Sequence, residues 1–327
     1  MKLFFIGDFT GDNGPASVNK VLKKYMNDNT FYSRETKKHK RLLELFMKIN
    51  KTDGVLFSGL SKVNVIGFRL AKLLSKKSAY LMHGSELIEG KINQNYNQKL
   101  INLENKVLKL APKIICVSEN FMHTFNDHYP QYIHKVTYVN NGVDWDLIGL
   151  SDHLKVKRKK NMLLSVGGGV PRKNILKLCE AIDSLNTQKK LNLELMVIGS
   201  HGPDTKRIKS YPFVTYIEKV PKKEMPRFYK MSQLYIQNSR FETFGLAVIE
   251  ALMCGSSILI SKNVGAKGII PQLDNNNIIN DVDDTEEISQ KIIYNLTNEN
   301  NKRLISSISK EKTSVKASYE KILNILE

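Results

Sequence analysis

The segment Leu234–Ser261, LYIQNSRFETFGLAVIEALMCGSSILIS, contains two short apolar runs separated by a polar loop and an apolar helical stretch. We predict a strand at Leu234–Asn238, a helix at Leu246–Met253 and a second strand at Ser257–Ser261. A strand, a helix and a strand in this order form a parallel pair joined by a crossover helix. The same alternation recurs along the chain, so the predicted fold class is α/β, with parallel sheets covered by helices on both faces.

The alternation divides into two halves, each with enough strands for a complete sheet. The other predicted strands are Leu3–Gly7, Gly54–Ser58, Ala79–His83, Lys113–Ser118, Val136–Asn140, Met162–Val166, Leu193–Gly199 and Val214–Lys219. The other predicted helices are Pro15–Met26, Lys37–Ile49, Val63–Leu74, Tyr96–Leu110, Arg172–Leu185, Lys223–Lys230 and Thr285–Leu296. We expect two doubly wound, Rossmann-like domains, residues 1–150 and 151–327, with a basic linker near Asp144–Lys160. The last segment, Asn300–Glu327, is predicted to be helical, and its final helix could pack back on the first domain.

The bulk composition sets limits on location and partners. The chain has 327 residues and a formal charge of +18, which favours an anionic partner such as nucleic acid, an acidic membrane or a phosphorylated substrate. The excess is spread over both halves, so we give it little weight alone. Cys116, Cys179 and Cys254 lie in separate apolar runs and are expected to be buried, reduced thiols. No apolar stretch reaches the roughly 20 residues of a membrane span, and Leu3–Gly7 is too short for a signal peptide.

Two glutamates in the opening segment are the first candidates for function. Glu242 follows a strand, and Glu250 is the one charged residue of an otherwise apolar helix. A buried carboxylate is costly unless it is paired or hydrogen-bonded, so Glu250 either holds a neighbouring loop or accepts hydroxyl groups of a ligand. We expect Thr243 to cap the helix and the helix to be buried on all sides. The amides of residues 244–246 at its N-terminus would suit a phosphate.

The two glutamates, with Phe-Gly after the first and Ala-Leu-x-x-Gly after the second, resemble the motif of the retaining glycosyltransferases of the GT-B fold, family 4. Further segments are similar to that family in the same order. They are ICVSENF and VTYVNNGVDW in the first half, and MLLSVGGGVPRKN, LELMVIGSHG, VTYIEKVPKKEM and FYKMSQLYIQNSRFETFG in the second. The resemblance is close over about residues 79–262. The segment with the two glutamates is its most specific part.

The resemblance implies a role for individual residues of this sequence. Glu242 would bind hydroxyls of the donor sugar, close to the reacting carbon. Glu250 would accept the ribose hydroxyls of the nucleotide. The amides of Phe244, Gly245 and Leu246 would face the diphosphate or the sugar.

A basic pair precedes the next helix in the second half. Lys173 stands where the family places a phosphate-binding lysine. The sequence departs from the family at Gly168, where an arginine that also holds the diphosphate is usual, and Arg172 is the candidate substitute. If Arg172 does not serve, phosphate binding is weaker or the donor unusual. The alternative is that both residues form a basic first turn of an exposed helix, which the helix dipole disfavours.

Two further candidates lie in the first half. The loop Gly7–Gly14 opens a helix with Pro15, and its glycines would let the backbone approach a ligand. In the GT-B family the matching loop reaches the donor phosphates and the acceptor, so Gly14 is a candidate. The loop lacks the dinucleotide and P-loop patterns, and a merely structural turn is the alternative. His83 ends a buried strand and is either a packing residue or, as the family implies, a neighbour of the donor sugar, with Glu86 a weaker candidate nearby.

The segment Lys37–Lys51, KKHKRLLELFMKINK, is basic and amphipathic. A surface helix packed on a sheet explains the pattern. The alternative is a peripheral contact with an anionic membrane, a role that basic patches of the acceptor domain often have in the family when the acceptor is lipid-linked.

The sequence and the resemblance together predict a retaining glycosyltransferase. It would move a sugar from a nucleoside-diphosphate sugar, with UDP favoured, to an acceptor hydroxyl in a surface polysaccharide, glycolipid or glycoprotein glycan. The catalytic candidates are Glu242, His83 and Lys173, and the donor-binding candidates are Glu250, Arg172, Phe244, Gly245, Leu246, Gly14 and Gly168.

No Asp-x-Asp metal motif is obvious in a loop after a strand, since the acidic Asp281–Asp284 is predicted to start a helix, and no metal-ligand spacing is visible. We therefore expect no cofactor and no metal, with Lys173, Arg172 and helix-end amides stabilising the leaving diphosphate. We expect a cytoplasmic protein, at most peripheral at the inner face of the membrane, that binds no nucleic acid. Two alternatives stay open: a sugar-nucleotide epimerase of the GT-B type, and a non-catalytic GT-B scaffold that binds an anionic partner.

Overall fold

The computed structural model describes residues 1–11, 13–146 and 155–327. The chain forms two compact units, Met1–Asp144 together with Lys310–Glu327, and Trp145–Ser309. The middle of the predicted linker, and with it the predicted boundary between residues 150 and 151, lies outside the described residues.

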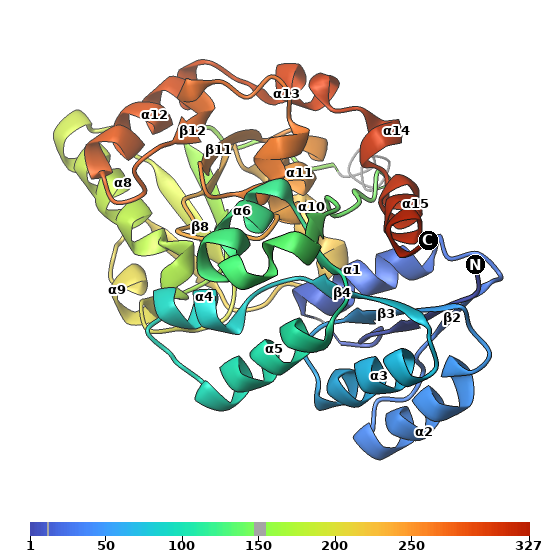
Figure 1. Cartoon of the computed structure of the whole chain (residues 1–327). Coiled ribbons are helices and arrows are strands. Elements are labelled where there is room, and N and C mark those ends of the chain that lie inside the picture. The colour runs from blue at the N-terminus through green and yellow to red at the C-terminus, as the bar shows by residue number, and fades with distance from the viewer. Residues whose placement is uncertain (12, 147–154) are drawn as a thin grey trace. The chain divides into compact units, whose positions relative to one another are not determined.

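The first unit is built on a six-stranded sheet with the order β2-β1-β3-β4-β5-β6, and every neighbouring pair is parallel (Figure 1). Its strands are β1 Leu3–Ile6, β2 Thr30–Tyr32, β3 Gly54–Ser58, β4 Lys77–Met82, β5 Ile114–Cys116 and β6 Val136–Tyr138. β1, β3 and β5 are buried at every position. Both rows of side chains are apolar in these strands because helices cover both faces of the sheet.

The helices of the first unit follow the strands in alternation. They are α1 Gly14–Lys23, α2 Lys38–Ile49, α3 Lys62–Leu73, α4 Glu86–Ile92, α5 Gln98–Leu110, α6 Glu119–His128, η1 Pro130–Lys135, α14 Lys310–Thr313 and α15 Val315–Leu326. Serines at the ends of strands cap three of them: Ser61 caps α3, Ser85 caps α4 and Ser118 caps α6, each accepting a backbone N–H. α2 contacts α3, and α3 contacts α5, so these three helices form one layer (Figure 1).

The C-terminal helix α15 packs within this first unit. Gly142 lies so close to it that a Cβ atom would stand 2.4 Å from Val315 Cα. Ser318 Oγ donates to the Asn140 carbonyl at 2.9 Å, and Lys77 Nζ donates to the Glu327 carbonyl at 2.6 Å. The last residues of the chain therefore complete the unit that the first residues begin.

The second unit has its own six-stranded parallel sheet, with the order β12-β11-β10-β7-β8-β9. Its strands are β7 Met162–Val166, β8 Glu194–Ile198, β9 Val214–Ile217, β10 Leu234–Gln237, β11 Ser257–Ser261 and β12 Ile278–Ile279. Its helices are η2 Pro171–Lys173, α8 Ile175–Lys189, α9 Thr205–Lys209, η3 Lys222–Glu224, α10 Met225–Met231, α11 Leu246–Met253, η4 Gly265–Ile269, η5 Asn275–Asn277, α12 Thr285–Thr297 and α13 Asn301–Ser307. Leu178 and Ile182 of α8 and Ile292 of α12 are fully buried in one core cluster with the sheet.

The predicted α/β class and the two parallel sheets are confirmed, and three corrections apply to the elements. The strands β2 and β12 were not predicted, because they have three and two residues and β2 is only half-buried. The short helices α4, α6 and α9 were also missed. The predicted helix Arg172–Leu185 begins only at Ile175, because Asn174 takes a left-handed conformation, with φ of 52°, and ends the preceding 3-10 turn.

The predictions for the cysteines hold, since Cys116, Cys179 and Cys254 are all buried and outside disulfides. Burial raises the pKa of the Cys116 thiol well above its ordinary value. None of the helices in the described ranges is both long and apolar enough to cross a membrane.

Candidate active site

Glu242 lies where the ends of three neighbouring strands meet. It is in the loop that leaves β10, and its backbone forms a parallel bridge with Val264, which follows β11. The Gly265 N–H donates to the Glu242 carbonyl at 3.1 Å. The loop is also tied to the segment that follows β7, because the Arg240 N–H donates to the Arg172 carbonyl at 2.8 Å. Sheet order places β11, β10 and β7 side by side, so these contacts follow from the topology.

The Glu242 carboxylate has three partners. Lys173 Nζ donates to Oε2, Gln237 Nε2 donates to the same oxygen at 2.8 Å, and Arg172 Nη1 lies 3.7 Å from it. The side chains are mostly buried, with 12% of Glu242, 15% of Lys173 and 22% of Arg172 exposed. The structure therefore brings together the three residues that the sequence predicted, and adds Gln237.

These partners decide the charge of Glu242. Burial raises its pKa, but the charges of Lys173 and Arg172, with the hydrogen bonds from Lys173 and Gln237, outweigh burial. The net pKa lies below the ordinary value, so Glu242 is a carboxylate at neutral pH. The cluster carries one more positive than negative charge, which suits an anionic ligand.

Gly168 can accept no side chain in this conformation. Its φ is +63°, and a Cβ atom would stand 2.1 Å from the Ser200 carbonyl oxygen and 2.6 Å from Gly199 C. The Gly169 N–H also donates to the Ser200 carbonyl at 3.1 Å. The glycine loop after β7 is thus closed against the loop after β8. An arginine at position 168 would need a different backbone, and the cations enter the site from η2 instead.

The start of α11 differs from the prediction. The N-cap is Gly245, with φ of +94°, and no side chain caps the helix, so the prediction for Thr243 was wrong. A positive φ is strained for any residue with a Cβ, and it turns the chain from the Glu242 loop into the helix. Phe244 is buried, and its backbone carbonyl accepts a hydrogen bond from the Ala266 N–H at 2.6 Å.

The helix α11 is not buried on all sides, contrary to the prediction. Leu246, Ala247 and Glu250 are only half-buried, and they share one side of the helix. Glu250 therefore lies eight residues beyond Glu242 on the partly exposed side of α11.

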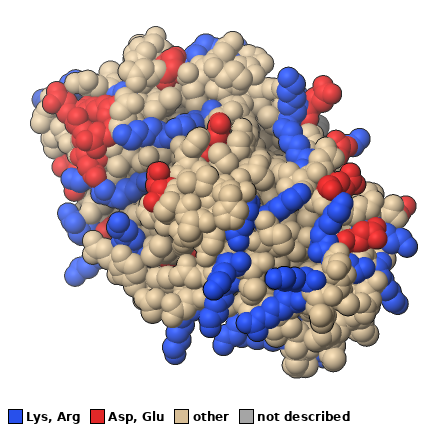
Figure 2. All heavy atoms as spheres, viewed as in Figure 1, with Lys and Arg blue, Asp and Glu red and all other residues tan. Residues whose placement is uncertain are grey.

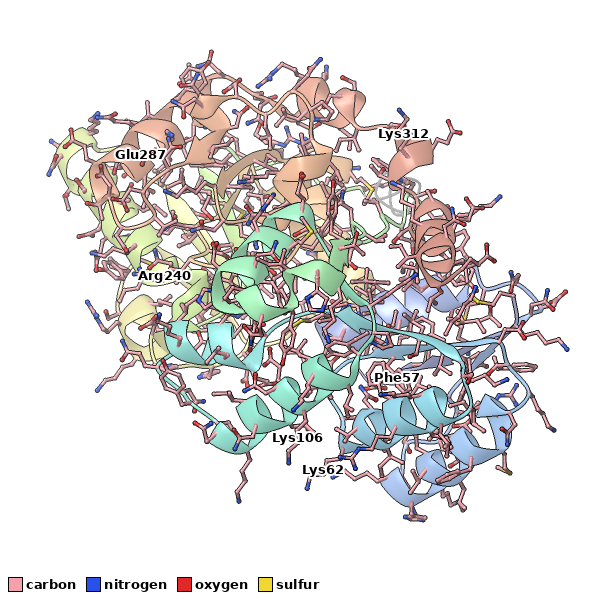
Figure 3. The ribbon with its side chains drawn as sticks, in the orientation of Figure 1. Phe57, Lys62, Lys106, Arg240, Glu287 and Lys312 are labelled. Atoms are coloured by element: carbon pink, nitrogen blue, oxygen red, sulfur yellow. The ribbon has the colours of Figure 1, made fainter. Side chains whose placement is uncertain are left out.

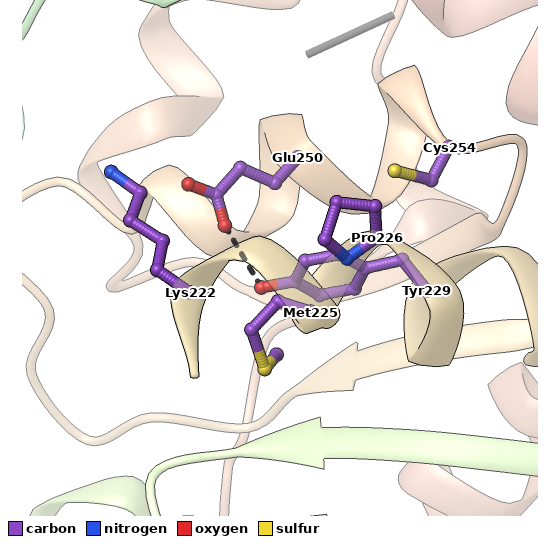
Figure 4. A pocket seen from close by; sticks show the side chains of 6 residues that line it. All are labelled: Lys222, Met225, Pro226, Tyr229, Glu250 and Cys254. Atoms are coloured by element: carbon purple, nitrogen blue, oxygen red, sulfur yellow. Dashed lines mark hydrogen bonds between the residues drawn. The ribbon is translucent and has the colours of Figure 1, made fainter. Parts of the chain in front are cut away.

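Glu250 lines a small open pocket with Lys222, Met225, Pro226, Tyr229 and Cys254 (Figure 4). The Tyr229 hydroxyl donates to Glu250 Oε2 at 3.0 Å. Burial and the Glu250 charge raise the pKa of Tyr229 well above its ordinary value, so it remains a donor. The carboxylate is thus oriented by a phenol from α10 and lies at the wall of this pocket.

His83 and Gly14 lie in the first unit. Gly14 is the first residue of α1, whose cap is Asn13, and a Cβ atom there would meet nothing within 4 Å. Packing therefore does not require glycine at this position. His83 directly follows β4, and its Nε2 lies 2.9 Å from Ser58 Oγ.

The hydrogen bonds around His83 fix the position of its proton. Asn19 Nδ2 donates to the Asp8 carbonyl at 3.0 Å, which leaves Asn19 Oδ1 as an acceptor for Ser58 Oγ at 2.9 Å. A serine hydroxyl has one proton, so Ser58 must accept from His83. The proton of the neutral ring is then on Nε2, and Nδ1 is the acceptor. Burial lowers the pKa of His83 to about 4, so the ring is neutral at pH 7.

Five residues of these sites were not predicted from the sequence. They are Gln237, Tyr229, Lys222, Ser58 and Asn19. Gln237 had a visible signal, as the polar last residue of an otherwise apolar strand. Ser58 had the same signal, as the polar last residue of the apolar strand Gly54–Ser58. Tyr229, Lys222 and Asn19 are ordinary residues of helical segments in sequence, and only the packing of elements brings them to Glu250 and His83. Within the part of the chain that the structure describes, no three His, Cys, Asp or Glu side chains gather as metal ligands.

Two parallel-sheet units, with cations and a carboxylate at the strand ends of the second, define a glycosyltransferase of the GT-B fold. Residues 150–312, just under half of the chain, match the family described as glycosyl transferases group 1.

The chain is similar to curated proteins of the same class. An uncharacterized glycosyltransferase of Methanocaldococcus jannaschii is 24% identical over 264 residues, which cover 78% of this chain and 68% of that protein. The O-antigen chain mannosyltransferase B of Escherichia coli is 25% identical over 140 residues, covering 41% of this chain and 36% of that protein. The chain thus spans about a third of the latter relative.

A solved structure confirms the fold. The chain is similar to Anabaena HepE in complex with UDP, with a TM-score of 0.73 and 14% sequence identity, covering 100% of this chain and 99% of that one. At this identity the likeness shows the fold alone.

We predict that Lys173→Met destabilises the second unit in a pH-dependent way. At pH 7 the buried Glu242 carboxylate loses its closest partner, and we expect the free energy of unfolding to fall by about 1–3 kcal/mol. The pKa of Glu242 is lower in the folded than in the unfolded protein. The ionised carboxylate therefore stabilises the fold above the unfolded pKa of 4.5, and this stabilisation is lost as the pH falls through the native pKa. The difference between wild type and variant in urea unfolding should therefore be smaller at an acidic pH below 4.5 than at pH 7. Lys173→Arg, which keeps the charge, is the control, and an equal difference at both pH values contradicts the assignment.

We predict that His83 is neutral, with its proton on Nε2, throughout the range from pH 7 to about pH 5. Nitrogen chemical shifts of the imidazole report both the tautomer and the titration midpoint, which should lie near 4. In Ser58→Ala the acceptor for Nε2–H is removed, so the Nδ1–H tautomer should become populated. A ring protonated on Nδ1 in the wild type would show that the assignment is wrong.

Proposed function

We propose that the protein is a retaining glycosyltransferase that moves a sugar from a nucleoside-diphosphate sugar to an acceptor hydroxyl. The observation that carries this proposal is the cluster of Glu242 with Lys173, Arg172 and Gln237. It stands at the carboxyl ends of neighbouring parallel strands, where open α/β sheets bind their ligands.

The diphosphate would bind at the two cations and at the start of α11. An ammonium group can donate three hydrogen bonds, so Lys173 can hold Glu242 and a phosphate oxygen together. Arg172 lies close enough to the same carboxylate to serve as the second cation, which a side chain at Gly168 could not supply in this backbone. The amides of Phe244, Gly245 and Leu246 add the positive end of the helix dipole.

The two glutamates would bind the hydroxyls on either side of the diphosphate. Glu242, ionised and held by Gln237, is suited to accept hydrogen bonds from the sugar. Glu250, oriented by Tyr229, is suited to accept both ribose hydroxyls. The pocket beside it, with Lys222 and Pro226, would then receive a part of the nucleoside.

The reaction would break the bond between the anomeric carbon and the β-phosphate oxygen and form a bond from the acceptor oxygen to the same carbon. Retention requires both events on one face of the sugar, and the acceptor proton passes to the departing phosphate. Lys173, Arg172 and the helix amides would stabilise the charge that develops on that phosphate. This needs no second carboxylate across the bond, in contrast to a glycosidase, and we propose that no metal or cofactor takes part.

We propose a UDP-sugar as the donor and a growing surface polysaccharide, glycolipid or glycoprotein glycan as the acceptor. The structure similar to this chain contains UDP, and one relative is named for the O-antigen chain. His83 and Gly14, at strand ends of the first unit, would contribute to the sugar and acceptor side of the reaction. Acceptor binding by the first unit and donor binding by the second remain part of this proposal.

We predict different losses for the two glutamates when sugar nucleotides are screened for hydrolysis and transfer. Glu242→Gln should lower kcat by about 100-fold or more, because a positioned charged group near the reacting carbon is lost. Glu250→Gln should mainly raise the KM for the donor by about 10-fold. Glu194→Gln, at an exposed glutamate of β8, is the control and should change neither value. Wild-type turnover in Glu242→Gln contradicts the proposed function.

A further inference from the structure

The helix α2 exposes large apolar side chains to solvent. Leu43 is 62% exposed, Phe46 47% and Met47 65%. They lie on one side of the helix at a spacing of three or four residues, while Leu45 and Ile49 on the other side are fully buried in the unit. Packing on the sheet explains why Leu45 and Ile49 are apolar, but it does not explain why Leu43, Phe46 and Met47 are.

The neighbouring helices continue this apolar surface. Ile66 and Leu73 of α3 are 38% and 79% exposed, and Leu100 of α5 is 37% exposed. Because α2, α3 and α5 form one layer, we call their outer sides together the α2–α3–α5 face. Clustered exposed apolar groups on a soluble unit mark an interaction surface more often than single ones do.

The charge of this face has one sign. Its exposed ionisable side chains are Lys38, Lys40, Lys62, Arg69, Lys72, Lys99, Lys106 and Lys109, with the exposed His39 of α2 beside them. Lys62 and Lys106 project from the lower side of the ribbon in Figure 3, and the same region of Figure 2 shows Lys and Arg but no Asp or Glu.

The carboxylates of these three helices point inward. Glu44 of α2 is buried, 4% exposed, and accepts from Lys48 and the Arg34 N–H. Glu104 of α5 is 1% exposed and accepts from Ser85 and Tyr129. Neither can therefore neutralise a lysine on the outer side.

We propose that the α2–α3–α5 face docks on an anionic lipid bilayer. A bilayer surface matches both features of this face. Its phosphate headgroups would contact the lysines, and the boundary between headgroups and acyl chains would contact Leu43, Phe46 and Met47. Nucleic acid would satisfy the charge but offers little to exposed Leu and Met side chains. This proposal does not depend on the transferase function, because vesicle binding is measured without any sugar donor.

A charge-reversal variant tests the electrostatic part. Lys38, Lys62 and Lys99 are exposed and stand in the first turns of α2, α3 and α5, where a carboxylate is favoured by the helix dipole. Lys38→Glu/Lys62→Glu/Lys99→Glu should therefore fold. The matched control is Lys206→Glu/Lys302→Glu/Lys316→Glu, with the same charge change in the first turns of α9, α13 and α15.

An apolar variant tests the insertion part. Leu43→Gln/Met47→Gln changes the two most exposed apolar side chains of α2 without touching its buried side. Ile133→Gln, at a residue 52% exposed in η1, is the control.

The measurement is co-sedimentation with vesicles of phosphatidylcholine and phosphatidylglycerol in equal parts, compared with phosphatidylcholine alone. Wild type should bind the anionic vesicles and lose binding as salt rises. The triple variant should lose at least about 10-fold in binding, since each basic residue near the surface contributes roughly fivefold, and both controls should keep it. The Leu43→Gln/Met47→Gln variant should also bind more weakly.

Three results would overturn the proposal. One is no binding of wild type to anionic vesicles at low salt. Another is an equal loss in the two triple variants, which would mean that only net charge matters. The third is tighter binding to single-stranded RNA than to vesicles under the same conditions, with the same dependence on Lys38, Lys62 and Lys99.

Discussion

A carboxylate buried at the end of a sheet must be compensated by groups that other strands bring to it. For Glu242 the donors are Gln237, which ends its own strand β10, and Lys173, which follows the neighbouring β7. On the other side, a backbone bridge to Val264, which follows β11, holds the loop. All three strands are parallel neighbours, so their carboxyl ends meet at one edge. Phe244, Gly245 and Leu246 follow Glu242 directly and lead into α11, so the start of that helix is set by this junction.

The glycine loop after β7 explains why the positive charge beside Glu242 comes from η2. Gly168 is pressed against Gly199 and Ser200, and its left-handed backbone excludes a side chain. Positive charge therefore comes from η2, whose two basic residues reach the carboxylate from the far end of the loop. The departure from the family pattern at Gly168 thus has a structural reason, and Arg172 lies beside Lys173 at the Glu242 carboxylate.

The sequence predicted regular elements better than their ends and contacts. The strands β3, β7 and β11 and the helix α11 have the predicted bounds, because apolar runs with clear flanking residues define them. The cap at Thr243 and the helix start at Arg172 were wrong because Gly245 and Asn174 adopt left-handed conformations. Asn174 does so with its side chain bonded to the carbonyl of Val282, 108 residues away. A contact between residues so far apart cannot be predicted from local sequence propensity. The same applies to the hydrogen bond between Tyr229 and Glu250.

The most direct test is a crystal structure of the protein with a bound nucleoside diphosphate. UDP, GDP and ADP would first be compared for binding, and the one that binds would be used. We expect the β-phosphate within hydrogen-bonding distance of Lys173 and Arg172, the ribose hydroxyls on Glu250, and Glu242 facing the position of the sugar. Binding of all three nucleotides away from this cluster, or of none of them, would contradict this expectation.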